Sequence, residues 1–115
     1  MSQWRFEASQ RLPELQSTIA SRSIRTPAEL WMELRSRFDE FCHHDPAPKD
    51  LLSRIWQYAK WSLNHKDEAV KWAAINHFFE HIEDTRHYRA VLPTFMSRQE
   101  YEQFTNSSAP KKERS

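Results

Sequence analysis

Glycine is absent from the 115 residues of this chain. Phosphate-binding loops, the dinucleotide-binding fingerprint, the nucleophile elbow and the EF-hand calcium loop each need glycine at a fixed position. The sequence therefore excludes these four kinds of site. Tight two-residue hairpins also favour glycine, because their turns need positive φ angles. The absence thus favours helices over hairpins, and binding over glycine-dependent chemistry.

Cysteine, long apolar runs and an excess of one charge are scarce as well. The one cysteine, Cys42, cannot form a disulfide within the chain, which fits a reducing cytoplasm. We expect no signal peptide and no membrane span, because no apolar run approaches the ~18 residues that a spanning helix needs. The net charge of +1 lacks the basic excess that is typical of nucleic-acid binders.

Apolar side chains recur at helical spacing along most of the chain, which predicts an all-α fold. The length favours one domain, over 1–105, with a disordered tail over 106–115. We expect a compact up-down bundle of about five helices. Its centre is a helical hairpin formed by residues 48–64 and 67–84. The polar segment 1–11 permits no firm assignment.

Capping signals mark several helix boundaries. Thr26 followed by Glu29 predicts a capping box at the start of a helix, and Ser97 with Glu100 predicts a second one. Pro93 is expected to end a shorter helix, since proline lacks a backbone N–H.

The sign of the charge alternates between successive segments. Residues 27–46 and 67–84 carry an excess of Asp and Glu, whereas 47–66 and 85–98 carry an excess of Lys and Arg. A surface pair contributes only about 0–1 kcal/mol. We therefore expect charge to bias the pairing of neighbouring helices, while the apolar faces drive folding.

Four short segments resemble a group of small uncharacterised bacterial helical proteins, a domain of unknown function. They are LPEL at 12–15, AELWMEL at 28–34, YAKW at 58–61 and FFEHI at 78–82. The resemblance covers about residues 12–105. It implies an all-helical fold and brings no functional residues with it.

The stretch from His77 to His81 reads H-x-x-E-H, the pattern of inverted zinc peptidases. His77 and His81 are four residues apart, so they share a helix face and could both reach zinc. Glu80 could then act as general base. The alternatives are a non-catalytic metal site and two histidines that close the edge of the core, because no clear further acidic ligand follows.

Trp61 falls outside the apolar face of its helix, among Arg54 and Gln57. Tryptophan is a favoured anchor of protein interfaces. The sequence therefore predicts a partner-binding surface at Trp61, Arg54 and Gln57. The alternative is that Trp61 packs beneath the N-terminal segment.

These observations favour a non-catalytic, cytoplasmic helical domain that binds a protein, in the way immunity proteins bind and neutralise their partners. The alternative function is a metal-binding protein or small zinc hydrolase that uses His77, Glu80 and His81. We expect no cofactor unless zinc binds there, and neither a nucleic-acid nor a membrane partner. The expected oligomeric state is a monomer or a weak homodimer.

Overall fold

A computed structural model describes residues 2–44, 46–80 and 88–102 of the chain. Every regular element in these ranges is helical, so the predicted all-α class is confirmed. The elements are α1 (Gln3–Arg11), the 3-10 helix η1 (Pro13–Leu15), α2 (Gln16–Ile19), α3 (Pro27–Cys42), α4 (Lys49–Leu63), α5 (Glu68–Ala74), the π-helix η2 (Ile75–Phe79) and α7 (Tyr88–Phe95). A further helical segment begins at residue 98.

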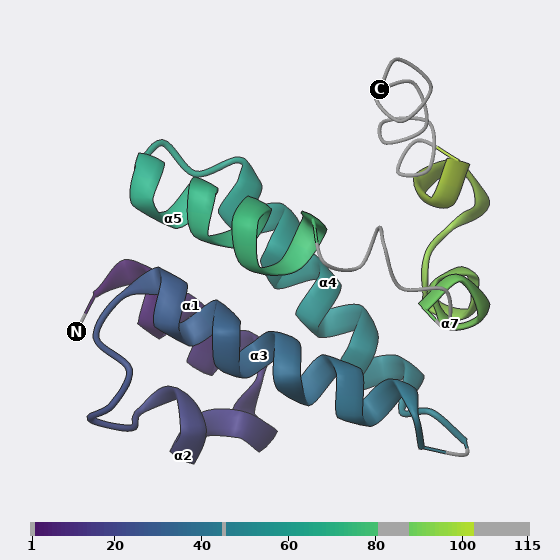
Figure 1. Ribbon diagram of the computed structural model, residues 1–115, viewed down its shortest axis with the longest axis horizontal. Coiled ribbons are helices and arrows are strands. Elements are labelled where there is room, and N and C mark those ends of the chain that lie inside the picture. The colour runs from purple at the N-terminus through teal and green to yellow at the C-terminus, as the bar shows by residue number, and fades with distance from the viewer. Residues whose placement is uncertain (1, 45, 81–87, 103–115) are drawn as a thin grey trace.

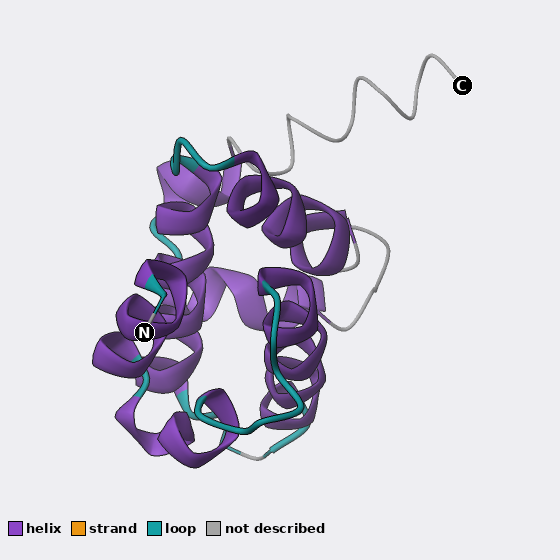
Figure 2. Cartoon of the chain, turned by 90° about the vertical axis from the view of Figure 1, so that its left-hand side faces the viewer, coloured by secondary structure: helices purple, strands orange, loops and turns teal. Residues whose placement is uncertain are grey.

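The long helices reverse direction one after another, as the predicted up-down arrangement requires (Figure 1). Helix α4 is central and packs against α1, α3, α5 and α7. Helices α4 and α5 form the predicted central hairpin, and α5 also lies along α3. Seen from the side, the described chain consists of helices and their connecting loops (Figure 2). The radius of gyration of 14.0 Å is close to the ~13 Å of a compact chain of this length.

Both predicted capping boxes are present. The Thr26 hydroxyl accepts from the backbone N–H of Glu29 at 3.2 Å, and the Glu29 carboxylate accepts from the Thr26 N–H at 3.1 Å. Ser97 and Glu100 repeat this reciprocal pair, with both distances at 3.1 Å. Each box satisfies two backbone N–H groups that the helix leaves without partners.

Aromatic rings fill the centre of the core. Trp31, Phe38, Tyr58 and Phe78 are fully buried. The Trp31 ring lies 4.9 Å from the ring of Phe78 and 5.3 Å from that of Tyr58. Phe38 meets Phe78 edge-on at 5.1 Å. These ring contacts join α3, α4 and η2 in one aromatic cluster at the centre of the core.

Within the segment without an assignment, Gln3–Arg11 form α1. Its start has no side-chain cap, and only Ala8 is fully buried, so the sequence carries little helical signal there. Tertiary contacts hold it instead. The Tyr58 hydroxyl donates to the backbone oxygen of Trp4 at 2.9 Å, and Arg5 donates to the backbone oxygen of Ile24.

The expectation that Pro93 ends a helix is wrong. Helix α7 continues past Pro93 to Phe95. The missing proline N–H removes one hydrogen bond, but the N–H of Met96 donates to the oxygen of Leu92 at 3.0 Å and closes the last turn.

The helix expected over 67–84 differs from a regular α-helix. Asp67 caps α5 by accepting from the N–H of Ala69 at 3.0 Å, and the chain then widens into a π-helical turn at 75–79. The remainder of that segment, over 81–84, lies outside the described residues, as does the predicted tail.

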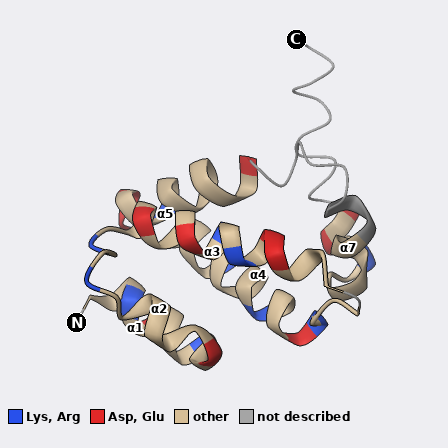
Figure 3. Cartoon of the chain, turned by 60° about the horizontal axis from the view of Figure 1, so that its bottom comes forward, with Lys and Arg blue, Asp and Glu red and all other residues tan. Residues whose placement is uncertain are grey.

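The alternating charge does not decide which helices pair. Figure 3 shows acidic positions on both α3 and α5, yet these two helices pack against each other. Buried apolar faces therefore outweigh the weak repulsion between exposed carboxylates, as expected from the size of each effect.

Candidate functional site

A depression of about 690 Å³ opens beside Trp61, where α1, α4 and the α4–α5 connection meet. Its lining combines three cationic side chains, three side-chain amides, a tryptophan and a histidine, and this described lining includes no carboxylate. The residues are Gln3, Arg11, Gln57, Lys60, Trp61, Asn64, His65 and Lys66. The surface is therefore polar and basic around one aromatic ring.

The depression brings together two of the three predicted partner contacts, Trp61 and Gln57. Helical spacing accounts for part of the set, because Gln57, Trp61 and His65 follow one another at intervals of four residues. That spacing could have revealed His65 from the sequence. The lining residues Gln3 and Arg11 had no such signal, since they come from α1, which sequence periodicity does not reveal.

The indole ring of Trp61 is half-buried and contacts two other rings. Its ring centre lies 5.7 Å from that of Tyr58, with 14° between the ring planes, and 4.9 Å from that of His65. Tyr58 in turn stacks on Trp31 in the core. The predicted alternative, packing beneath the N-terminal segment, is realised in part, because α1 lies beside the ring and leaves it half-exposed.

His65 connects α1 with the turn after α4. Its Nδ1 accepts from the backbone N–H of Asp67 at 2.9 Å, and its Nε2 lies 3.0 Å from the Oε1 of Gln3. These two contacts fit the neutral imidazole with its proton on Nε2. The ring is thereby held against Trp61, and the wall of the depression is positioned by residues that are far apart in the sequence.

The three cations of the lining differ in how they are paired. Arg11 donates through Nε to the Glu7 carboxylate at 2.7 Å, and Lys60 is paired with Glu100. Hydrogen bonding from Lys60 holds the pKa of the Glu100 carboxyl below its usual range. In the described part of the chain Lys66 takes part in no ion pair, and it is exposed. The depression therefore keeps a positive character.

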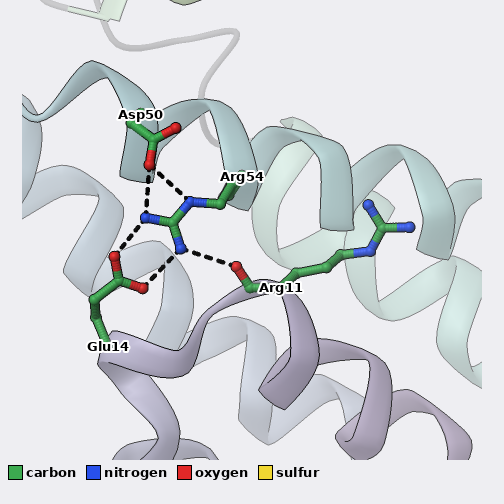
Figure 4. Close-up of polar contacts among 4 residues, drawn as sticks. All are labelled: Arg11, Glu14, Asp50 and Arg54. Atoms are coloured by element: carbon green, nitrogen blue, oxygen red, sulfur yellow. Dashed lines mark hydrogen bonds and ion pairs between the residues drawn. The ribbon is translucent and has the colours of Figure 1, made fainter.

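Arg54, the third predicted contact, is not among the residues that line the depression. Figure 4 shows its contacts instead. Its guanidinium donates to Asp50 at 3.0 Å, to the backbone oxygen of Arg11 at 3.0 Å and to Oε1 of Glu14 at 2.7 Å. The hydrogen bond from Arg54 lowers the pKa of Glu14 to about 2, and the same pair raises the pKa of Arg54. Arg54 therefore ties α4 to the N-terminal segment.

The predicted metal residues fall on η2 and the residues that follow it. His77 is half-buried within the π-helical turn, whereas Glu80 is exposed directly after it. A π-turn holds more residues than an α-turn. The angle about the helix axis between His77 and Glu80 is therefore larger than in a regular α-helix, where residues three apart lie on nearly the same face. His81 lies outside the described residues. Across the described ranges, no three His, Cys, Asp or Glu side chains are placed to hold one metal ion.

Cys42 is buried at the end of α3. Burial raises the pKa of its thiol to about 12, with a smaller contribution from Asp39. The reactive thiolate is therefore scarce at neutral pH, which fits a structural thiol better than a nucleophile.

Within the described ranges, no helix combines the length and the apolar character that crossing a membrane requires. No protein-family model matches the chain, and no curated protein or solved structure is similar to it. The resemblance to small bacterial helical proteins therefore stays a prediction, and functional inference rests on the residues themselves.

Proposed function

We propose that this protein is a non-catalytic helical domain that binds another protein through the depression at Trp61. One observation carries the proposal: a half-buried tryptophan, fixed by ring stacking, sits in a polar depression built from α1, α4 and the connection to α5. Rigid aromatic anchors surrounded by polar groups are typical of interface hot spots, because little side-chain entropy is lost on binding.

The described groups with catalytic potential support this choice over an enzyme. The Cys42 thiol is buried, and burial raises its pKa. His77 is half-buried within the widened turn, whereas Glu80 is exposed directly after it. We propose further that the protein acts in the cytoplasm, since its single cysteine needs no oxidising environment.

Capture of partners from cells of the source organism tests the proposal. The tagged full-length protein is compared with Trp61→Ala and with Trp72→Ala as a matched control. Trp72 is 49% exposed on α5 and does not line the depression. We expect Trp61→Ala to lose a protein that the other two forms retain. Equal recovery by all three forms, each shown to be folded by circular dichroism, would refute the proposal.

The more specific form of the proposal is an immunity-like role, in which binding neutralises the partner. It is tested on the captured partner by measuring its activity or toxicity with and without this protein. Neutralisation by the wild type and not by Trp61→Ala is the expected result, and unchanged activity in the bound state would refute this form. Sedimentation of the protein alone then tests the proposed monomer or weak homodimer.

A further inference from the structure

We infer that the depression takes an acidic segment of the partner, with carboxylates against its cations and an apolar side chain on the Trp61 ring. This inference rests on the proposed function and names the chemistry of its partner. It commits to a peptide segment. It draws on two features of the lining, unused cationic donors and unused amide groups, and on the acidic residues that follow the lining in the chain.

Two cationic side chains of the lining, Arg11 and Lys66, have donors that no described residue uses. Arg11 bonds to Glu7 through Nε, and within the described residues its two terminal nitrogens make no hydrogen bond. They form the planar fork that matches a carboxylate. Lys66 is exposed in the connection that follows α4 and has no ion pair among the described residues. Lys60 is already paired with Glu100, so Arg11 and Lys66 are the side chains that favour carboxylates and disfavour cations.

The amides favour a peptide. Gln3 uses its Oε1 for His65, and Asn64 uses its Nδ2 for the oxygen of Lys60 at 2.9 Å. Among the described residues, the amide nitrogen of Gln3, the amide oxygen of Asn64 and the whole amide of exposed Gln57 make no hydrogen bond, so they are open to a ligand. This set contains both donors and acceptors, which the C=O and N–H groups of a bound backbone can pair with.

The edge of the depression limits the length of the anionic segment. Asp67 and Glu68 follow Lys66 directly, and both are exposed. Helix α5 lies in turn along α3, which is also rich in carboxylates (Figure 3). A short acidic segment stays within the basic lining, whereas a long polyanion such as nucleic acid runs into this repulsion. The charge distribution therefore favours an acidic peptide over nucleic acid.

Nuclear magnetic resonance titration of the full-length protein tests the inference directly. The probe is a blocked tetrapeptide of three glutamates and one tyrosine, and its control replaces the glutamates by glutamines. Titrations run at an ionic strength of about 0.02 M, where exposed charges are weakly screened. We expect the acidic peptide alone to shift the indole N–H of Trp61 and the backbone amides of Gln57 and Lys66.

Charge reversal supplies the matched variants. Lys66→Glu removes one attraction and adds one repulsion, which is expected to weaken peptide binding about tenfold. Lys49→Glu makes the same change of charge at an exposed site at the far end of α4, outside the depression. It is expected to leave the affinity within about twofold, because a distant exposed charge is screened.

Several results would overturn the inference. Equal binding of the glutamine peptide would show that carboxylates are not recognised. Tighter binding of a single-stranded oligonucleotide at the same resonances would assign the site to nucleic acid. Self-association that Lys66→Glu abolishes would assign it to a second copy of the chain. If Trp61-dependent capture of a cellular partner is insensitive to Lys66→Glu, the acidic-segment inference fails while the proposed function stands.

Discussion

The contact between Arg54 and Glu14 yields a quantitative prediction for Glu14→Gln. The pKa of Glu14 is about 2 in the folded protein against an ordinary value of 4.5. For a pair shielded from water that gap corresponds to about 3 kcal/mol. The Glu14 side chain is 49% exposed, so solvent screening reduces the expected contribution to about 1 kcal/mol. We therefore expect Glu14→Gln to lower the free energy of unfolding by about 1 kcal/mol at pH 7.

The pH dependence follows from the direction of this pKa change. Because the folded protein holds Glu14 ionised more strongly than the unfolded chain, the stabilisation is complete above about pH 5. It is lost progressively as the pH falls from about 5 through the folded-state pKa of about 2, and both states bind the proton only below that pH. The difference in stability between wild type and Glu14→Gln should therefore be full at pH 7, small at pH 2 and absent only below that pH.

Urea unfolding at a series of pH values, followed by circular dichroism, measures this difference. The matched control is Asp50→Asn, which removes the second carboxylate bonded to Arg54. Asp50 is 86% exposed, so its loss should cost no more than about 0.5 kcal/mol. A difference between wild type and Glu14→Gln that is constant from pH 7 to pH 2 would refute the electrostatic explanation.

Three further predictions concern the core, the C-terminal segment and the metal alternative. Phe78→Ala should lower the unfolding free energy by about 3–5 kcal/mol in chemical denaturation, because Phe78 is fully buried against Trp31; a loss below 1 kcal/mol would contradict this packing. Glu100→Gln should accelerate proteolysis within 98–102 at neutral pH, since it weakens the contacts to Trp56 and Lys60; an unchanged cleavage rate would argue against this attachment. A chelator should leave the melting temperature of the purified protein unchanged. A decrease that metal analysis links to zinc, and that His77→Ala abolishes, would instead support the zinc alternative.

Local capping signals explain why the starts of two helices, α3 and the helical segment that begins at residue 98, could be predicted. Thr26 with Glu29, and Ser97 with Glu100, satisfy backbone groups within four residues of each other. Such contacts join residues that are close in the sequence, so they can be predicted without the tertiary structure. Pro93 shows the limit of this reasoning, because the end of α7 is closed by the bond between Met96 and Leu92 despite the proline.

The candidate site was only partly predictable for a related reason. Trp61 and Gln57 share one face of a single helix, so their spacing reveals them. Arg11 reaches the same depression from α1, which has little amphipathic pattern and is held by tertiary contacts. Arg54 is the opposite case. It lies on a polar helix face, where the sequence predicts a partner contact, but its guanidinium bonds to the N-terminal segment of the same chain. Helical periodicity indicates which residues share one face of a helix, whereas tertiary packing determines which other parts of the chain contact that face.

The contact between Gln3 and His65 has a consequence for the timing of binding. Its two members are separated by 62 positions in the sequence. At about 5–20 residues per second, the ribosome needs roughly 3–12 s to synthesise the stretch between them. During that interval the residues of α4 and of its following turn that complete the lining are not all synthesised, so the depression does not exist on the nascent chain. Recognition through this surface therefore begins only after α4 and its following turn have been synthesised and folded.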